Sequence, residues 1–238
     1  MENTPRIKGI IFDYGGTIDS RGVHWSEIIW DGYQAAGIGI DKAQFRDAYV
    51  YAERELARTR HILPHHNFLD LLRIKMRLEL EWLAREEIMQ PDTDGHLGEA
   101  VARYCYNAAR ECVEEARPVL EALCSRYPMV LVSNFYGNVE AVLTDFDLRR
   151  YFKAIIESAV VGVRKPDPAI FALGVDALGM KPGEVLVVGD SLRKDILPAE
   201  SLGCRVAWIK GKGWTPDEDA ATHPSVFKKL SDLLDVAF

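Results

Sequence analysis

Four short apolar segments, each closed by turn-forming residues, constrain the fold of this chain more than any other feature. They occupy residues 7–12, 129–132, 185–188 and 205–209. Short β-branched runs of this kind are typical of strands that are buried on both faces of a sheet. Helical patterns lie between or beside them, at residues 118–127, 138–145, 168–178 and 196–202. Because strands and helices alternate, the sequence predicts an α/β fold with a doubly wound parallel sheet.

The segment between the first and second predicted strands has a different pattern. From about residue 19 to residue 115, apolar residues recur at helical spacing, as in Phe45, Ala48, Tyr49, Ala52 and Leu56. Pro64 and Pro91 break this segment into pieces. We therefore predict two units, a core made of residues 1–18 and 116–238 and a helical insert made of residues 19–115.

Charge and composition exclude several functional classes. The 238 residues include 29 Lys and Arg against 36 Asp and Glu, a net charge of −7, and no long basic run that would bind a nucleic-acid backbone. The apolar runs are too short to cross a bilayer. Four scattered cysteines predict reduced, buried thiols, at Cys105, Cys112, Cys124 and Cys204. We therefore expect a cytoplasmic protein that binds neither nucleic acid nor membrane.

Polar residues gather at the ends of the predicted strands and in one loop, at the edge where open parallel sheets bind ligands. They are Asp13, Ser133, Asn134, Lys165, Asp190 and Asp195. Three carboxylates in one crevice would repel one another and raise the pKa of at least one of them. A divalent cation together with the Lys165 ammonium cancels three negative charges, and oxygen-only ligands suit Mg²⁺. The sequence therefore predicts a magnesium site at this edge.

The same residues resemble the four motifs of the haloacid dehalogenase (HAD) superfamily, most of whose members are Mg²⁺-dependent phosphatases and phosphotransferases. The strand followed by Asp-x-Asp-x-Thr is similar to residues 12–17 (FDYGGT), and the strand-end serine to residues 131–134 (LVSN). The lysine motif is similar to residues 164–168 (RKPDP), and the acidic pair to residues 189–195 (GDSLRKD). The resemblance implies a HAD-like Rossmannoid core, with the helical insert in the position of the family's cap domain.

The resemblance also implies a role for each of these residues. Asp13 and Lys165 would be catalytic, with Asp13 attacking phosphorus to form an aspartyl-phosphate. The phosphoryl oxygens would be held by Ser133, the Asn134 backbone, Lys165 and Thr17. The metal ion would be bound by Asp13, Asp190, Asp195 and the backbone carbonyl of Gly15.

One position departs from the family pattern. Most family phosphatases carry a second aspartate two residues after the nucleophile, which protonates the leaving group and later activates water. This position is Gly15 here, and the loss of a general acid–base typically costs about 10² to 10⁴ in rate. His24, where the chain enters the insert, is our candidate for the missing group, because an ordinary pKa of about 6.5 suits both proton donation and acceptance.

These features predict a Mg²⁺-dependent phosphohydrolase that acts on a small phosphorylated metabolite, as a monomer or a homodimer. A metal-independent haloacid dehalogenase would share the aspartate nucleophile, but an anionic haloacid gains nothing from two additional carboxylates without a cation. A phosphonate hydrolase would lack the second aspartate and use a cap lysine as a Schiff base, for which only Lys42 and Lys75 are available. Gly15 also leaves open a catalytically impaired binding protein of the same fold.

Overall fold

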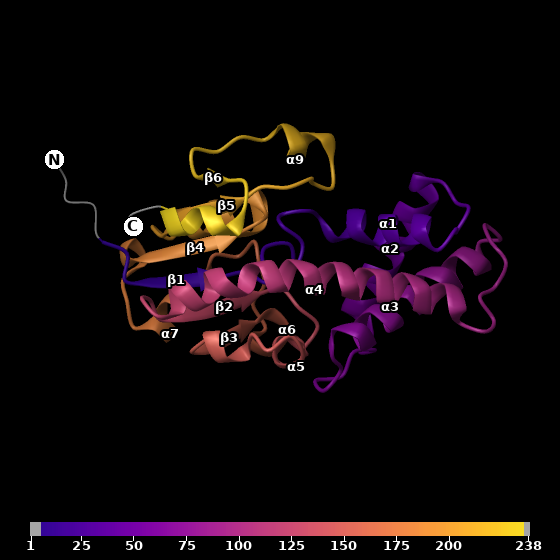
Figure 1. Cartoon of the computed structure of the whole chain (residues 1–238), viewed down its shortest axis with the longest axis horizontal. Helices are drawn as coiled ribbons and strands as arrows, with labels where there is room; N and C mark the ends of the chain where they lie inside the picture. The colour runs from indigo at the N-terminus through magenta and orange to yellow at the C-terminus, as the bar shows by residue number, and fades with distance from the viewer. Residues whose placement is uncertain (1–5, 236–238) are drawn as a thin grey trace.

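A six-stranded parallel sheet forms the centre of the computed structural model, which describes residues 6–235 (Figure 1). The strands are β1 (Gly9–Phe12), β2 (Met129–Ser133), β3 (Ala154–Glu157), β4 (Val185–Gly189), β5 (Arg205–Ile209) and β6 (Val226–Phe227). Their order across the sheet is β3-β2-β1-β4-β5-β6, and all neighbouring pairs are parallel. All four predicted strands are confirmed, and they are the four at the centre of this order.

Alternate strand residues enter two separate hydrophobic cores, one on each face of the sheet. Ile10 and Phe12 pack into the core that includes α4 and α5, whereas Ile11 packs into the core that includes α7. The helices of this part are α5 (Val139–Asp145), α6 (Ser158–Val161), α7 (Ala169–Leu178), α8 (Leu197–Ser201) and α9 (Pro216–Ala220). Short helical turns add η1 (Arg149–Tyr151), η2 (Pro182–Glu184), η3 (Leu192–Ile196) and η4 (Leu230–Asp235). Burial on both faces confirms the doubly wound α/β fold.

The chain between β1 and β2 is helical, as predicted. Its helices are α1 (Trp25–Ala35), α2 (Lys42–Arg58), α3 (Phe68–Arg85) and α4 (His96–Cys124). Asp41 and Asn67 begin α2 and α3 with side-chain caps that bond the first-turn N–H groups. Figure 1 shows α1, α2 and α3 grouped at the opposite end of the molecule from the sheet, while α4 extends along both parts.

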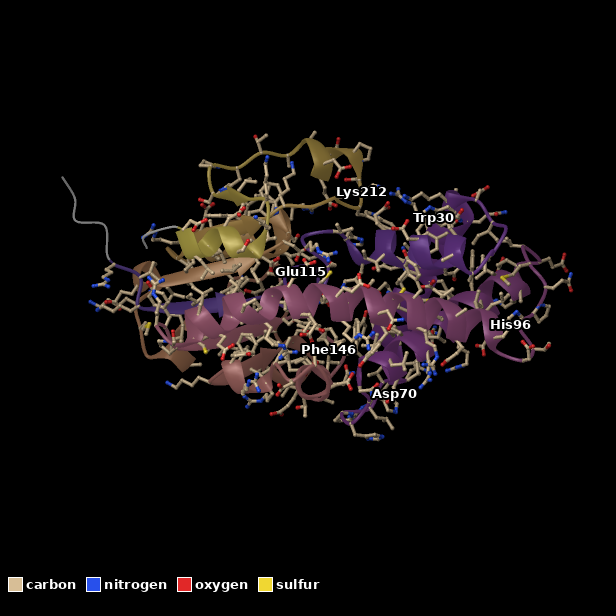
Figure 2. The ribbon with its side chains drawn as sticks, viewed as in Figure 1. Trp30, Asp70, His96, Glu115, Phe146 and Lys212 are labelled. Atoms are coloured by element: carbon tan, nitrogen blue, oxygen red, sulfur yellow. The ribbon has the colours of Figure 1, made fainter. Side chains whose placement is uncertain are left out.

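Helix α4 corrects the prediction of a separate helix at residues 118–127. It is one helix of 29 residues that ends at Cys124 and contains Pro118 in its interior, and Glu115, three residues before the proline, lies in its second half (Figure 2). The helix continues through the proline because its buried stripe is uninterrupted, through Val101, Ala102, Cys105, Ala109, Cys112, Val113, Ala116, Val119, Leu120 and Leu123. Cys124 falls off this stripe and is exposed, which corrects its predicted burial.

Two strands of the sheet have no clear signal in the sequence. β3 has only four residues, of which three are half-buried, and β6 has two. They form the two edges of the sheet, where pairing with a neighbour rather than burial on both faces defines the strand. Within residues 6–235, no helix combines the length and the apolar character needed to cross a membrane. The predicted core also includes residues 1–5 and 236–238, which lie outside the described residues.

Glu79, on α3, is a carboxyl group buried among the helices of the insert. Its exposed fraction is 0%, and its Oε2 accepts a hydrogen bond of 2.9 Å from the Tyr33 hydroxyl. Burial raises the pKa of Glu79 from 4.5 to about 7, although Lys75 and Tyr33 oppose the shift. This carboxyl is therefore partly protonated near neutral pH.

Glu79→Gln should stabilise the protein at alkaline pH more than at acidic pH. Between pH 4.5 and 7 the native state holds more protons than the unfolded state, so the free energy of unfolding falls as the pH rises. Glutamine keeps an acceptor for Tyr33 without this loss. In urea denaturation, we expect the variant to exceed the wild type by less than about 1 kcal/mol at pH 5 and by about 3 kcal/mol at pH 8. An equal difference at both pH values would contradict the prediction.

Candidate active site

The carboxyl ends of β1, β2 and β4 meet at one edge of the sheet, because these strands are adjacent and parallel. The register aligns Phe12 with Leu131 of β2 and with Val188 of β4. The Asp13 N–H continues this pairing by donating to the Val188 carbonyl at 2.9 Å. Asp13 therefore lies between the ends of two neighbouring strands, where polar groups from both can reach it.

Lys165 contacts two carboxylates at this edge. Its Nζ lies 2.6 Å from Asp13 Oδ1 and 2.7 Å from Asp195 Oδ1, and the residue is only 4% exposed. Burial alone would lower the pKa of Lys165, but the attraction of Asp13 and Asp195 outweighs it and raises the pKa above its usual value. Lys165 is thus a fixed positive charge beside Asp13.

Three carboxylates form the acidic cluster that the sequence predicts. Asp13, Asp190 and Asp195 each place one oxygen within 4.8 Å of the others. Burial and the repulsion of Asp195 and Asp13 raise the pKa of Asp190, and burial raises that of Asp195 against the opposing charge of Lys165. One ammonium cannot balance three carboxylates, so the cluster suits an added cation. Its oxygen-only donors fit Mg²⁺.

Two buried hydroxyls bind the same carboxylates. Ser133 Oγ donates to Asp13 Oδ1 at 3.2 Å, and Thr17 Oγ1 lies 3.2 Å from both Asp13 Oδ2 and Asp190 Oδ1. Both residues are at most 2% exposed. Both carboxylate oxygens of Asp13 therefore lie within hydrogen-bond distance of a donor, and the structure brings together the predicted residues of the first two motifs.

The Asn134 side chain has a function that the sequence did not indicate. Its Oδ1 accepts from the Lys165 N–H at 2.9 Å, and its Nδ2 donates to the Lys165 carbonyl at 3.0 Å. The amide thus bonds both backbone groups of the lysine across a separation of 31 residues. Asn134 positions Lys165, whereas its predicted backbone contact to a phosphoryl group stays a prediction.

The two glycines that follow Tyr14 have opposite surroundings. A Cβ atom at Gly15 would have no heavy atom within 4 Å. A Cβ atom at Gly16 would lie 2.3 Å from Asp190 Oδ2, and Gly16 has a φ of +99°. Gly16 therefore permits the close approach of Asp190, while the position of the missing family aspartate is open enough for a side chain.

Asp19 is a buried residue of this loop that the sequence analysis missed. It is 1% exposed and accepts hydrogen bonds from the Gly16 N–H at 2.7 Å and from the Trp25 indole at 3.2 Å. Burial raises the pKa of Asp19 to about 7, against the effect of these hydrogen bonds. Asp19 joins the loop after β1 to the start of α1. Its only sequence signal is a carboxylate inside an otherwise apolar and small-residue loop.

His24 caps the N-terminus of α1. Its Nδ1 accepts from the Ser26 N–H at 3.2 Å, and its ring lies 6.1 Å from Tyr49 and 5.3 Å from Trp214. Burial, followed by the charges of Lys194 and Lys75, lowers the pKa of His24 to about 4. The imidazole is therefore neutral at pH 7. No hydrogen bond joins it to Asp13 in the described part of the chain, and its role as acid–base stays a prediction.

Both lysines of the insert are engaged in ion pairs. Lys42 Nζ lies 2.6 Å from Glu27 Oε2, and Lys75 Nζ contacts Glu53 Oε1. Burial would lower the pKa of Lys75, but Glu53 outweighs it and raises the pKa above its usual value. A Schiff base requires a neutral amine, so this pairing argues against phosphonate cleavage through Lys75.

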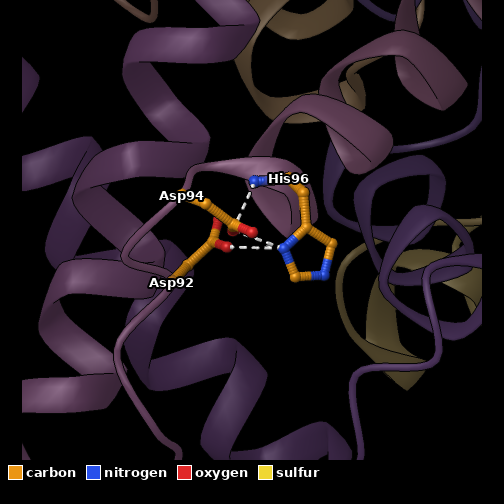
Figure 3. Close-up of side chains that lie close together, drawn as sticks. All are labelled: Asp92, Asp94 and His96. Atoms are coloured by element: carbon orange, nitrogen blue, oxygen red, sulfur yellow. Dashed lines mark hydrogen bonds and ion pairs between the residues drawn. The ribbon is translucent and has the colours of Figure 1, made fainter.

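A second acidic group lies at the start of α4 (Figure 3), where Figure 2 shows His96 at the end of the molecule opposite the sheet. Asp92 accepts from the Leu97 and Gly98 N–H groups at 3.2 and 2.8 Å. Asp94 Oδ1 lies 2.5 Å from Nδ1 of the exposed His96. Hydrogen bonds to the helix N-terminus and the ion pairs of His96 with Asp92 and Asp94 account for these side chains, so this group serves as a control for the cluster at Asp13.

The arrangement defines a class of protein. An aspartate bound by a buried lysine and flanked by an acidic pair, at the carboxyl edge of a doubly wound sheet with a helical insert, is a Rossmann-like α/β hydrolase site. A family model described as haloacid dehalogenase-like hydrolase matches residues 7–203. The chain belongs to this family, which confirms the resemblance of its motifs.

Several relatives are phosphatases by name. Phosphoserine phosphatase of Thermus thermophilus is 30% identical over 164 residues, which cover 60% of this chain and 64% of the relative. Glyceraldehyde 3-phosphate phosphatase of Pyrococcus abyssi is 29% identical over 205 residues, which cover 84% and 79%. In the first three relatives the match spans 64%, 31% and 38% of their own length, which is less than two thirds.

Solved structures share the fold over nearly the whole chain. A dehalogenase with an intermediate complex gives a TM-score of 0.65 at 20% identity and covers 98% of this chain and 99% of its own. The HAD-hydrolase YfnB of Bacillus subtilis, bound to magnesium, gives 0.58 at 17% identity and covers 97% and 98%. These likenesses show a HAD-type fold, in agreement with the match to the haloacid dehalogenase-like hydrolase family.

Proposed function

We propose that the protein is a Mg²⁺-dependent phosphohydrolase of small phosphorylated metabolites that reacts through an aspartyl-phosphate on Asp13. One observation carries the proposal. The carboxylate of Asp13 lies 2.6 Å from a buried ammonium and within 4.8 Å of two further carboxylates. A site with this excess of negative charge favours a divalent cation, and cation and lysine together attract a phosphoryl dianion.

In the proposed reaction, a carboxylate oxygen of Asp13 bonds to phosphorus while the bond from phosphorus to the leaving alcohol oxygen breaks. Lys165, Ser133 and Thr17 supply donors to the oxygens around the reacting centre. The leaving oxygen takes up a proton from solvent, directly or through a general acid, and the water that attacks in the second step returns one. Water then attacks the phosphorus of the aspartyl-phosphate, which releases inorganic phosphate and restores the Asp13 carboxylate.

Asp13, Asp190 and Asp195 would hold Mg²⁺, with the Gly15 carbonyl as a further ligand. The bound ion would supply Lewis-acid stabilisation of charge on the phosphoryl oxygens. We also propose that residues 19–115 act as a cap over this edge, since Glu53 of α2 bonds Tyr136 of the loop after β2. His24 remains our candidate for acid–base catalysis. Because its Nδ1 accepts from the Ser26 N–H, the neutral ring carries its proton on Nε2, the nitrogen that would donate to the leaving oxygen.

The alternatives have less support. In a metal-independent dehalogenase no cation would offset the repulsion between Asp190 and Asp195. The phosphonate hydrolase requires a neutral cap amine, whereas Lys42 and Lys75 are both paired. A catalytically impaired binding protein rests on Gly15 alone, and it predicts ligand binding without turnover.

Chelation of Mg²⁺ should abolish phosphate release. With p-nitrophenyl phosphate as substrate, we expect EDTA to lower the rate by about 100-fold or more and excess MgCl₂ to restore it. The bound ion would stabilise the charge of the transition state by several kcal/mol. Full activity in EDTA, or chloride release from chloroacetate without added metal, would contradict the proposal.

A matched pair of acidic substitutions tests the location of the metal. Asp190→Asn should raise the Mg²⁺ concentration for half-maximal activity by about 10-fold or more, because one charged ligand is lost. Asp94→Asn, in the second acidic group, should leave it unchanged. Calorimetric titration with Mg²⁺ alone gives the same comparison without a substrate. Equal effects of the two substitutions would show that the cluster at Asp13 is not the metal site.

A further inference from the structure

Glu53 of the helical insert contacts the loop that follows β2, the strand next to that of the nucleophile. The order β2-β1-β4 places Asp13 between the loops that follow β2 and β4. Tyr136 stands on the first of these loops, and its hydroxyl donates to Glu53 Oε1 at 3.0 Å and Oε2 at 3.2 Å. Lys194 stands on the second, close enough for its charge to favour the ionised form of Glu53. Glu53 therefore contacts one of the segments that flank the Asp13 strand, and the charge of Lys194 on the other acts on it from a distance.

Glu53 is the accessible member of a buried ion pair. The Lys75 side chain is 5% exposed and contacts Glu53 Oε1, whereas the Glu53 side chain is 36% exposed. Burial would raise the pKa of Glu53, but Lys75, Tyr136 and Lys194 outweigh it and lower the pKa. The exposed group of the pair is thus an ionised hydrogen-bond acceptor whose negative charge is balanced by the buried Lys75.

Aromatic rings adjoin the same ion pair. Lys75 Nζ lies 4.0 Å from the centroid of the Tyr49 ring, and this ring lies 5.4 Å from the ring of Trp214. The Trp214 ring lies 5.3 Å from that of His24. The Glu53 carboxylate suits a ligand with hydroxyl groups, since hydroxyls donate to a carboxylate. The buried Tyr49 ring holds Lys75 in place, and the Trp214 ring already has the Arg46 guanidinium 4.5 Å from its centroid.

We propose that Glu53, held by Lys75 and Tyr136, binds the hydroxyl groups of the substrate's leaving group, so that the substrates are phosphate esters of neutral polyols or sugars. The inference rests on the proposed phosphohydrolase function. Within the described residues, Oε2 of Glu53 has Tyr136 as its hydrogen-bond donor, and a carboxylate oxygen has capacity for another.

Charged leaving groups fit this position less well. A carboxylate would be repelled by Glu53. An ammonium would gain little from Glu53, because Lys75 already balances its charge and Lys194 adds a further positive charge nearby. A neutral hydroxyl is neither repelled by Glu53 nor opposed by the nearby lysines. It still donates a hydrogen bond to an ionised acceptor, which is stronger than a bond to a neutral acceptor.

Glycerol 3-phosphate and propyl phosphate form the test, because they share a three-carbon chain and differ in two hydroxyls. We expect kcat/KM of the wild type to be at least about 10-fold higher for glycerol 3-phosphate. Glu53→Leu combined with Lys75→Met removes the acceptor without leaving an unpaired charge, and it should bring this ratio close to one. Glu53→Gln should reduce the ratio as a single change. Glu99→Gln, which removes an exposed ion pair between α3 and α4, should keep it.

Binding separates this inference from the proposed function. Calorimetry on Asp13→Asn with the same two esters measures recognition without turnover, and we expect about 10-fold tighter binding of glycerol 3-phosphate. If the wild type hydrolyses neither ester nor p-nitrophenyl phosphate, the proposed function fails, whereas a binding preference that Glu53 variants abolish still supports the recognition site. Equal binding of both esters, or a preference that the double variant retains, would overturn the inference.

Discussion

Asp13→Asn should lose phosphatase activity by about 10⁴-fold or more, the effect expected when a covalent nucleophile is removed. An amide does not displace the leaving alcohol, yet its oxygen still accepts from Lys165 and Ser133, so the site keeps its shape. Initial rates of phosphate release measure the loss. Acid-quenched mass spectrometry of the wild type should also find a phosphorylated peptide that contains Asp13, which a dehalogenase would not form.

Asp167→Asn is the matched control for this change. Asp167 lies two residues after Lys165, is exposed, and accepts a 2.9 Å hydrogen bond from the Ala169 N–H at the start of α7. The asparagine side-chain oxygen can accept the same bond, so we expect wild-type rates. Residual activity of Asp13→Asn within a factor of about 10 of the wild type would show that another residue is the nucleophile.

Gly15→Asp should increase the rate for substrates with poor leaving groups by about 100-fold. The substitution restores a carboxyl where most family phosphatases have one, and the open space around the Gly15 Cβ position accommodates it. An alkyl phosphate needs a proton on its leaving oxygen, whereas p-nitrophenolate is already stable as an anion. We therefore expect a large gain for an alkyl phosphate and a small one for p-nitrophenyl phosphate.

Two variants accompany this experiment. Gly16→Ala should lose activity and Mg²⁺ affinity, because its Cβ would lie 2.3 Å from Asp190 Oδ2. His24→Ala should lower the wild-type rate if the imidazole moves the proton, and Gly15→Asp should then rescue it. Unchanged turnover in His24→Ala would remove His24 from the reaction, and equal rates of Gly15→Asp and wild type on both substrates would show that proton transfer does not limit the rate.

The centre of the fold and the cluster at Asp13 could be predicted from the sequence for the same physical reason. A strand buried on both faces must be apolar along its length, so the polar residue that ends it stands out, as Asp13 does after Phe12 and Asp190 after Gly189. Parallel pairing then brings these ends to one edge. The sequence order of the motifs was enough to place Lys165 there as well.

Other features depend on contacts that spacing does not encode. Asn134 and Lys165 are 31 residues apart, and their bonds form only when two loops meet. Glu53 and Tyr136 are 83 residues apart. β3 is defined by its neighbour rather than by its own composition, and α4 passes through Pro118 because packing on both sides of the proline outweighs one lost hydrogen bond.

The length of α4 affects how the protein admits a ligand. This single helix packs against α1 and α3 of the insert and against η1 and η4 of the core. It is therefore held in place by both parts of the molecule. A movement of the insert away from the sheet must therefore either move the whole of α4 or bend it. Bending costs the least free energy at Pro118, because the proline nitrogen donates no backbone hydrogen bond to the helix.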